Sequence, residues 1–177
     1  MSNNIEQKLF TAGTFIDLTK AFDSLDHSIL LDKLSYYGVR DLPLHWLGSY
    51  LSKRSHYVSI NDVNSDLISV SNGVPQGSIL GPLLFNIYIN DIVRSSETLK
   101  FILFVDDTAI LLAGDNVNNL AVSMNAEIVH VLKWLTCNKL QLNFKKLTSF
   151  YLDLRSVQIL LIFVSLLIII KSLELIL

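Results

Sequence analysis

Residues 101–114 read Phe101-Ile-Leu-Phe-Val-Asp106-Asp107-Thr-Ala-Ile-Leu-Leu-Ala-Gly114. Two apolar runs, rich in β-branched and aromatic residues, flank a pair of adjacent aspartates. Such runs on either side of a short polar segment indicate two strands joined by a tight turn. The pattern therefore predicts a β-hairpin with both aspartates at its tip.

The aspartate pair has two interpretations. Asp is a common turn residue, so Asp106 and Asp107 alone are typical of an ordinary hairpin turn. Two adjacent carboxylates repel each other, however, unless a proton or a cation neutralises them. Mg²⁺ is usually held by one or two carboxylates together with substrate phosphates. The choice between an ordinary polar turn and a magnesium site therefore depends on residues upstream in the sequence.

The composition limits the class of protein. A chain of 177 residues fits one domain. Its formal charge of −2 lacks the basic footprint of a self-contained nucleic-acid binder. The single cysteine, Cys137, excludes an internal disulfide and a Cys-based zinc site, and it suits a reducing compartment such as the cytoplasm or the nucleus. The polar N-terminus is unlike a secretory signal.

The first part of the chain predicts one strand followed by two helices. Gly13–Leu18 has strand character, with Asp17 near its C-terminal end; a lone Asp there is usually a turn residue or a helix cap. Apolar residues recur at helical spacing over residues 27–37. Asp41 and Pro43 indicate the start of a second helix, in which Trp46 and its apolar neighbours are expected to be buried.

A small basic patch, Lys53-Arg54-Ser-His56, follows this helix. It is typical of a solvated helix end, and phosphate contact is the alternative. Residues 57–61 and 66–70 have strand character around a turn-rich segment.

The segment Asn72–Pro82 contains three glycines and two prolines and cannot be a regular helix or strand interior. Glycine lets another molecule approach the backbone closely. The ordinary interpretation is a surface loop that leads into a buried helix over residues 80–92. It accounts for the glycines and prolines but not for Gln76, which lies between Pro75 and Gly77. A long amphipathic helix over residues 117–135, with Leu132 among the residues expected to face inward, and a short extended segment complete the pattern.

This order of elements predicts an α+β fold. It is similar to a ferredoxin-like split β-α-β antiparallel sheet with helices on one face and extra helices between the first strand and the hairpin. The fold would bring Asp17 beside Asp106 and Asp107. Three carboxylates at one sheet edge make a site for two divalent ions, which can stabilise the attacking and leaving oxygens of a phosphoryl transfer.

Four segments resemble the successive palm motifs of reverse transcriptases. They are Phe15-Ile-Asp17-Leu-Thr-Lys-Ala-Phe22-Asp23, the long run from Gly73 to Asp91, Phe104-Val-Asp106-Asp107, and Leu140-Gln-Leu-Asn143-Phe-Lys-Lys146. The resemblance covers about residues 12–152. The extension Tyr88-Ile-Asn-Asp91 is most similar to the polymerases of non-LTR (LINE-like) retrotransposons.

The resemblance implies RNA-directed DNA synthesis with two Mg²⁺ ions, an RNA template, a DNA primer and dNTPs. It implies that Asp17 and Asp106 are metal ligands and that Asp107 completes the acidic cluster. The Phe22 ring would exclude a 2′-hydroxyl, and Gln76 and Gly77 would pack against the nascent base pair. The substrate-binding residues implied in this way are Leu18, Phe22, Gln76, Gly77 and Lys146.

The expected domains are a remnant of the fingers connection (1–12), the reverse transcriptase palm (13–153) and an apolar tail (154–177). The tail is interpreted as degenerate coding, with a membrane-interacting segment as the alternative. We expect the chain alone to be inactive or impaired because fingers and thumb motifs are lacking, and because Leu147 separates Lys146 from Thr148 where the family has Lys-Thr.

Two other functions fit the sequence. One is a non-enzymatic, domesticated palm that binds nucleic acid or protein. The other is a group II intron or retron-type reverse transcriptase, against which the Tyr88–Asp91 extension argues. The oligomeric state is not indicated by any motif.

Overall fold

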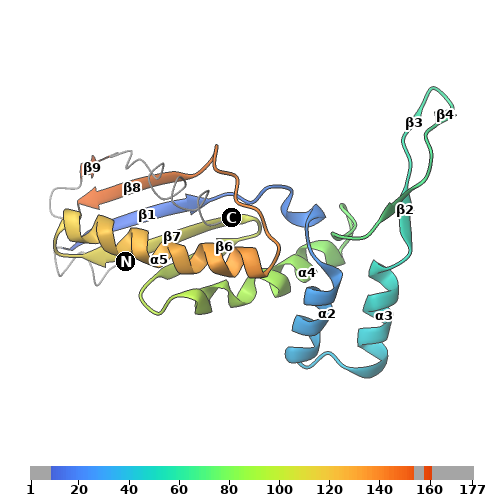
Figure 1. Cartoon of the computed structure of the whole chain (residues 1–177), viewed down its shortest axis with the longest axis horizontal. Coiled ribbons are helices and arrows are strands. Elements are labelled where there is room, and N and C mark those ends of the chain that lie inside the picture. Colours follow the sequence, from blue (N-terminus) through green and yellow to red (C-terminus); the bar gives the residue numbers. More distant parts are fainter. Residues whose placement is uncertain (1–8, 154–157, 161–177) are drawn as a thin grey trace. The chain divides into compact units, whose positions relative to one another are not determined.

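The computed structural model describes residues 9–153 and 158–160. The fold is mixed α/β, an antiparallel sheet accompanied by helices (Figure 1). The chain forms two compact units, which we call the sheet unit (residues 1–18, 92–134 and 142–177) and the helical unit (residues 19–91 and 135–141).

The sheet unit is a five-stranded antiparallel sheet in the order β6-β7-β1-β8-β9. Its strands are β1 (Phe10–Ile16), β6 (Lys100–Phe104), β7 (Asp107–Gly114), β8 (Thr148–Asp153) and β9 (Gln158–Leu160). The predicted hairpin is β6 and β7, joined by the two residues Val105 and Asp106. The strand that carries Asp17 at its end, β1, lies between β7 and β8, so the predicted antiparallel sheet is confirmed.

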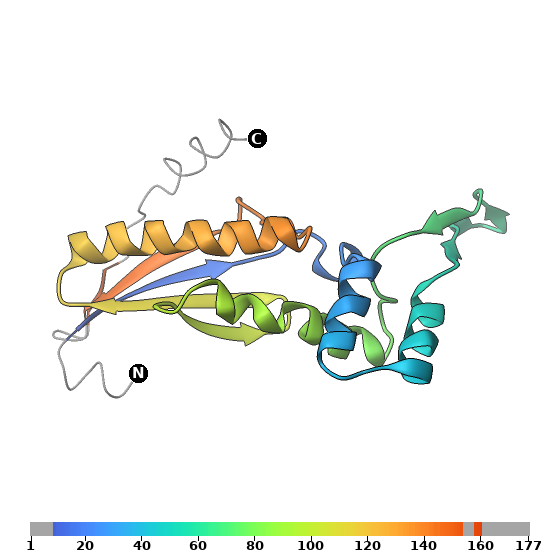
Figure 2. The ribbon, with the colours of Figure 1, turned by 60° about the horizontal axis from the view of Figure 1, so that its bottom comes forward.

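Helix α5 (Val117–Cys137) crosses one face of this sheet (Figure 2). Its buried residues in the sheet unit are spaced by three or four positions, which places them on one side of the helix; they are Leu120, Met124, Ile128 and Val131. Leu132, also expected to face inward, is only half-buried. Neighbouring positions on a helix point in different directions, and Val131 already occupies the inner face.

The helical unit contains α2 (His27–Tyr36), α3 (Asp41–Leu51) and α4 (Leu80–Ile89). It also holds the short helix η1 (Ala21–Asp23), and η2 (Asn90–Ser95) begins at its end. Two small ribbons, β2 (Arg54–His56) with β5 (Ile68–Val70) and β3 (Ser59–Ile60) with β4 (Val63–Asn64), replace the longer strands expected over residues 57–61 and 66–70.

Tyr88 is the centre of the packing in the helical unit. Its ring is fully buried, and its hydroxyl donates to the Asn138 carbonyl at 2.7 Å. Burial raises the pKa of the Tyr88 hydroxyl to about 12, so it remains a donor at all ordinary pH values. The Lys33 ammonium contacts the Tyr88 carbonyl and the Asp91 carboxylate, each at 2.6 Å, while burial lowers the pKa of Lys33 and Asp91 opposes that shift.

The expectation that Trp46 is buried is wrong. Trp46 is 56% exposed and stacks on Tyr50 at 5.7 Å between ring centroids. Helix α3 packs on α2 along one side only, so the part of its apolar surface that includes Trp46 is left uncovered.

Most of the expected fingers remnant (residues 1–12) and of the expected tail (residues 154–177) lies outside the described residues, which exclude 1–8, 154–157 and 161–177. The possible membrane segment lies there too. Among the helices of the described part of the chain, none combines the length and the apolar character that crossing a bilayer requires.

Candidate functional site

The antiparallel ladder between β1 and β7 brings Asp17 and Asp107 together. The ladder pairs Phe15 with Ala109 and Ile16 with Thr108, so the next position along it sets Asp17 opposite Asp107. Residues that face each other across an antiparallel pair share one side of the sheet. Both aspartates line a cavity of about 390 Å³, together with Lys146.

Asp17 is held by two side chains from the segment before β8. The Lys146 ammonium lies 3.2 Å from Asp17 Oδ1, and the Asn143 amide donates to Asp17 Oδ2 at 2.9 Å. The Asn143 backbone N–H also donates to the Asp17 carbonyl at 2.9 Å. An ammonium and an amide therefore fix the carboxylate in a half-buried position.

Asn143 was not among the predicted site residues. It stands in the fourth motif, and its amide suits a carboxylate partner, but Asp17 lies 126 positions away along the chain. Only the return of β8 alongside β1, continued by the bridge between Leu18 and Leu142, brings the two together.

Asp106 occupies the second position of the two-residue turn. The first position, Val105, has φ 55°, in the left-handed region. A β-branched residue is an outlier there, and such strained positions cluster at functional sites. The turn exposes the Asp107 side chain and leaves Asp106 half-buried.

The carboxylates suit a hard divalent cation, because Mg²⁺ prefers oxygen ligands. Asp17 and Asp107 supply oxygens to one cavity, and Asp17 already binds a cationic group there. In the part of the chain that the structure describes, no three His, Cys, Asp or Glu side chains meet closely enough to form a metal cluster. The structure thus places Asp17 and Asp107 at one cavity, and Asp106 directly precedes Asp107 in the turn.

In the helical unit, three more predicted residues meet. Phe22, Gln76 and Gly77 line one cavity of about 410 Å³, with Pro75 and Ser78. The Phe22 ring packs against Phe85, with 4.8 Å between the centroids. This contact fixes one face of the Phe22 ring and leaves the residue half-buried at the cavity wall.

The loop that carries Gln76 is held against η1 and the segment that follows it. Gly73 N–H donates to the Leu25 carbonyl at 2.7 Å, and Val74 N–H to the Phe22 carbonyl at 2.9 Å. A Cβ on Gly73 would lie 2.7 Å from the Asp23 Cα, so only glycine allows this approach.

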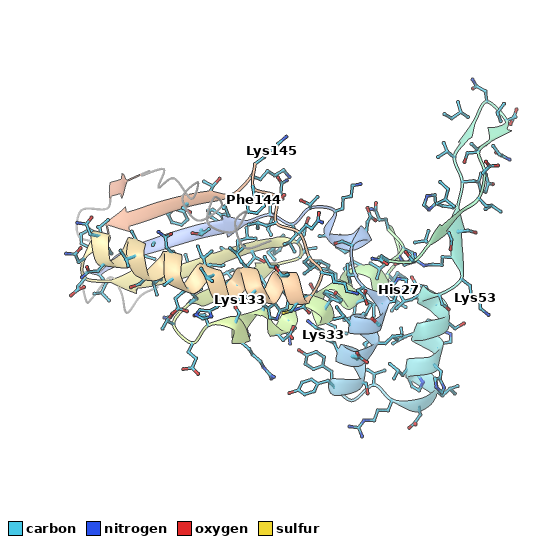
Figure 3. The ribbon with its side chains drawn as sticks, viewed as in Figure 1. His27, Lys33, Lys53, Lys133, Phe144 and Lys145 are labelled. Carbon is cyan, nitrogen blue, oxygen red and sulfur yellow. The ribbon has the colours of Figure 1, made fainter. Side chains whose placement is uncertain are left out.

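Two basic side chains clamp the same loop, a role that no sequence pattern indicates. Arg54 donates to the Gly73 carbonyl at 2.5 Å, and His27 Nε2 lies 2.8 Å from the same oxygen. Figure 3 shows His27 at the start of α2. The position of His27 against the loop depends on the tertiary fold, since Gly73 lies 46 positions away along the chain.

Leu18 and Lys146 complete the predicted set. Leu18 is only 6% exposed and belongs to the core, and its backbone forms an antiparallel bridge with Leu142. The Lys146 side chain is 66% exposed and lies at the Asp17 carboxylate.

Comparison with known proteins gives a family match over almost the whole chain. Residues 2–162 match the family described as reverse transcriptase (RNA-dependent DNA polymerase). The chain is 32% identical over 114 residues to the RNA-directed DNA polymerase from mobile element jockey of Drosophila melanogaster, which covers 60% of this chain and 12% of that protein. It is 30% identical over 142 residues to a probable RNA-directed DNA polymerase from transposon BS of the same species, covering 73% of this chain and 15% of the relative. The chain thus spans about an eighth of the length of these relatives.

Solved structures share the fold. Telomerase from Candida tropicalis, in complex with a TWJ fragment of telomeric RNA, superimposes with a TM-score of 0.64 at 11% identity, covering 93% of this chain and 32% of that one. Telomerase from Candida albicans gives the same TM-score at 15% identity, with 89% and 32% covered. At such identities the likeness concerns the fold, which is that of a polymerase palm.

Proposed function

The chain belongs to the reverse transcriptase (RNA-dependent DNA polymerase) family, and from this premise we propose that residues 13–153 carry the catalytic palm of a non-LTR retrotransposon polymerase. The proposed reaction is template-directed nucleotidyl transfer onto a DNA primer along an RNA template. The observation that carries the proposal is the register that sets Asp17 opposite Asp107, at the end of the hairpin that also bears Asp106.

Reverse transcriptases generally use divalent metal ions. We infer that Asp17, Asp106 and Asp107 would hold two Mg²⁺ ions. When bound, such ions supply charge neutralisation for the attacking and leaving oxygens of the transfer.

The side chains of the palm position the reacting groups, because phosphoryl transfer depends mainly on alignment and charge. Asn143 keeps the Asp17 carboxylate turned toward the cavity. Lys146 is suited to contact a phosphate or to give a proton to the departing pyrophosphate, since its ammonium is exposed. The Phe22 ring would stand against the sugar, and Gln76 and Gly77 against the base pair.

Primer extension tests this function. The segment 13–153 replaces the corresponding part of the jockey polymerase, and extension of a DNA primer on an RNA template is followed with Mg²⁺. We expect the chimera to synthesise DNA, and Asp17→Asn or Asp106→Asn to abolish synthesis. Asp66→Asn, in an exposed loop of the helical unit, is the matched control and should leave synthesis unchanged. Full synthesis by the Asp17→Asn chimera would refute the proposed site.

The unmodified chain is tested beside the chimera. We expect it to be inactive alone, because it matches only about an eighth of the length of these relatives. Primer extension by the chain itself at the rate of the chimera would contradict this expectation.

A further inference from the structure

The two faces of the sheet in the sheet unit differ in what covers them. Helix α5 lies on one face, because a Cβ at Gly114 would come within 3.2 Å of the Leu120 side chain on that helix. Side chains alternate between the two faces along a strand, so Ile110 and Leu112 share the face of Gly114, and both are buried. The alternate positions form the opposite face, which we call the open face.

The open face carries large apolar side chains that are exposed. Phe15 of β1 and Ile102 and Phe104 of β6 are 49%, 54% and 75% exposed. The register places Phe15 and Ile102 on either side of Ala109, so three apolar residues form a row across three strands. In an antiparallel sheet with one solvated face, the positions on that face are normally polar. Apolar residues in these places indicate that a second layer covers the open face.

An aromatic floor continues this row toward β8. Phe150 lies over Gly13, where a Cβ would overlap its ring, and it stacks on Phe15 with 5.4 Å between the ring centroids. Both residues lie on the open face, because Gly13 and Phe150 are paired and Gly13 and Phe15 are two positions apart on β1. The apolar surface thus extends from β8 through β1 and β7 to Ile102 and Phe104 on β6. A partner that covers it must be apolar and must cross several strands.

The chain contains an apolar segment that begins beside this face. Strand β9 ends at Leu160 at the edge of the sheet, and the residues after it read Leu161-Ile-Phe-Val-Ser-Leu-Leu-Ile-Ile-Ile170. Nine of these ten residues are apolar. Neighbouring strands lie about 4.8 Å apart, so the distance from β9 to β6 is about 19 Å. Ten residues span about 15 Å as a helix and about 33 Å when extended, so the segment is long enough to cross the apolar surface.

Two arguments favour this segment over a second copy of the chain as the occupant. Residues 142–177 belong to the same compact unit as β6 and β7, and the other face of the sheet is already covered by α5. A segment tethered at Leu160 is also present at a high effective concentration, whereas a second copy must associate from solution.

We propose that residues 161–170 pack across the open face of the sheet and contact Phe15, Ile102 and Phe104. The segment gives the sheet a second apolar layer, opposite α5. Phe15 also lines the cavity of Asp17 and Asp107, so the segment borders these carboxylates. The contact is a property of the folded chain and does not depend on the reaction proposed above.

Photo-crosslinking in the full 177-residue chain tests this contact. The photoreactive amino acid p-benzoylphenylalanine replaces Phe104 or, as the matched control, Val122 on the exposed side of α5. Trypsin cleaves after Arg155 and Lys171, so it releases the segment in one peptide that mass spectrometry identifies. We expect position 104 to cross-link to residues 161–170 of the same chain, with a yield that is unchanged on dilution. Position 122 should give no such cross-link.

Two outcomes of the cross-linking would overturn the inference. Cross-links from position 104 that join two chains and disappear on dilution would assign the open face to a second copy. Absence of cross-links from position 104 to the segment, or an equal yield from position 122, would show that the segment does not lie on the open face.

Cysteine labelling measures how completely the open face is covered. Ile102→Cys and, as the control, Val122→Cys are placed in a Cys137→Ser background, because Cys137 is exposed. A maleimide should modify the thiol at position 102 about tenfold more slowly than the thiol at position 122, which corresponds to an opening free energy of about 1.4 kcal/mol.

A change within the segment should remove this protection. Leu166→Asp should raise the labelling rate at position 102 to that at position 122, because a buried carboxylate opposes packing on an apolar surface. Leu175→Asp makes the same change outside the proposed segment and should leave the protection intact. Equal rates at positions 102 and 122 in the parent, or protection that survives Leu166→Asp, would overturn the proposal. Neither experiment uses metal, template or nucleotide, so failure of this contact and failure of the polymerase proposal are told apart.

Discussion

At the scale of single residues, the site depends on side chains whose conformation the neighbouring structure imposes. Val105 is the clearest case, because a β-branched residue takes a left-handed conformation at φ 55°. Type II′ hairpin turns need positive φ at this first central position, which glycine adopts freely. The ladder between β6 and β7, whose last pair is Phe104 with Asp107, holds Val105 in place.

We predict that Val105→Gly stabilises the protein. Relief of the left-handed conformation gains about 1–2 kcal/mol, and the greater freedom of glycine in the unfolded chain cancels about 0.5–1 kcal/mol of this. The free energy of unfolding, measured by urea denaturation, should therefore rise by up to about 1.5 kcal/mol.

A Val→Gly substitution at an unstrained position should have the opposite effect and lower the free energy of unfolding. Val122→Gly, at an exposed position inside α5, should cost about 0.5 kcal/mol because glycine is a poor helix former. If Val105→Gly lowers the free energy of unfolding as much as Val122→Gly does, the left-handed conformation of Val105 is not strained.

Lys146 gives a second prediction at this scale, for metal affinity. Its ammonium lies 3.2 Å from Asp17 Oδ1 and opposes a second cation at the same carboxylate. Since exposed ion pairs contribute at most about 1 kcal/mol, Lys146→Gln should tighten Mg²⁺ binding by up to about fivefold. Isothermal titration calorimetry measures the change, and Lys145→Gln is the neighbouring control. Equal Mg²⁺ affinity in the two variants would show that Lys146 does not compete for the site.

At the scale of elements, strand β1 explains the arrangement of the site. It is the strand that pairs with both β7 and β8, so it brings Asp17 to the hairpin on one side and to Asn143 and Lys146 on the other. Gly13 in its centre faces Phe150 of β8, and a Cβ at Gly13 would overlap the Phe150 ring.

We predict that Gly13→Ala destabilises the sheet by about 1–3 kcal/mol, the usual cost of overpacking. Combining it with Phe150→Ala should remove most of this cost, because the ring that the new methyl group meets is then absent. Urea denaturation of the single and double variants measures the coupling.

Gly48→Ala provides the matched control. The nearest atom to a Cβ at Gly48 is 3.8 Å away, and the position lies inside α3, so alanine should stabilise by up to about 1 kcal/mol. Additive effects of Gly13→Ala and Phe150→Ala would mean that the ring does not set the requirement for glycine.

At the scale of the whole molecule, the chain forms two units, and each carries part of the predicted site. The carboxylates and Lys146 belong to the sheet unit, whereas Phe22, Gln76 and Gly77 belong to the helical unit. Within the helical unit, Asp26 joins two distant segments. Its side chain accepts from the Ser28 and Ile29 N–H groups, which caps α2, and it forms an ion pair with Lys139 at 2.6 Å.

We predict that Asp26 stabilises the helical unit in a pH-dependent way. The Lys139 ammonium and then the Ser28 side chain hold the pKa of Asp26 well below its usual range. A carboxyl group whose pKa is lower in the folded than in the unfolded protein stabilises the fold at pH values above its unfolded-state pKa, near 3.9. This stabilisation is lost as the pH falls through the folded-state pKa. Asp26→Asn keeps the cap but loses the charge, so it should cost at most about 1 kcal/mol at neutral pH. The difference from the parent should shrink as the pH is lowered below about 4.

Asp26→Ala removes the cap as well and should cost about 1–2 kcal/mol more. Hydrogen exchange followed by mass spectrometry locates the effect: amides of α2 should lose protection, while those of β1 and β7 keep it. A difference between Asp26→Asn and the parent that persists unchanged at low pH would contradict the role of the charge, and equal deprotection of α2, β1 and β7 would contradict an effect of Asp26 confined to the helical unit.

Much of this organisation could be predicted from the sequence. The hairpin with its aspartates, the strand before Asp17, the Gly- and Pro-rich loop and the long amphipathic helix each follow from local periodicity and turn chemistry, which neighbouring residues determine. The expected burial of Trp46 was wrong, and the strands expected over residues 57–61 and 66–70 are shorter in the structure, at Ser59–Ile60 and Ile68–Val70. The neighbours that cover an element or pair with it cannot be derived from the residues of that element alone.

The amino-acid order by itself determined which residues are chemically suited to the site, and the family to which the chain belongs. Only the tertiary structure decided that Asp17 faces Asp107, that Asn143 holds Asp17, that Arg54 and His27 clamp the loop before Gln76, and that Lys20 shares a cavity with Lys53. The physical reason is the distance along the chain. Local patterns arise from interactions within a few residues, whereas these contacts depend on the register of a sheet and on loops that close over tens of residues.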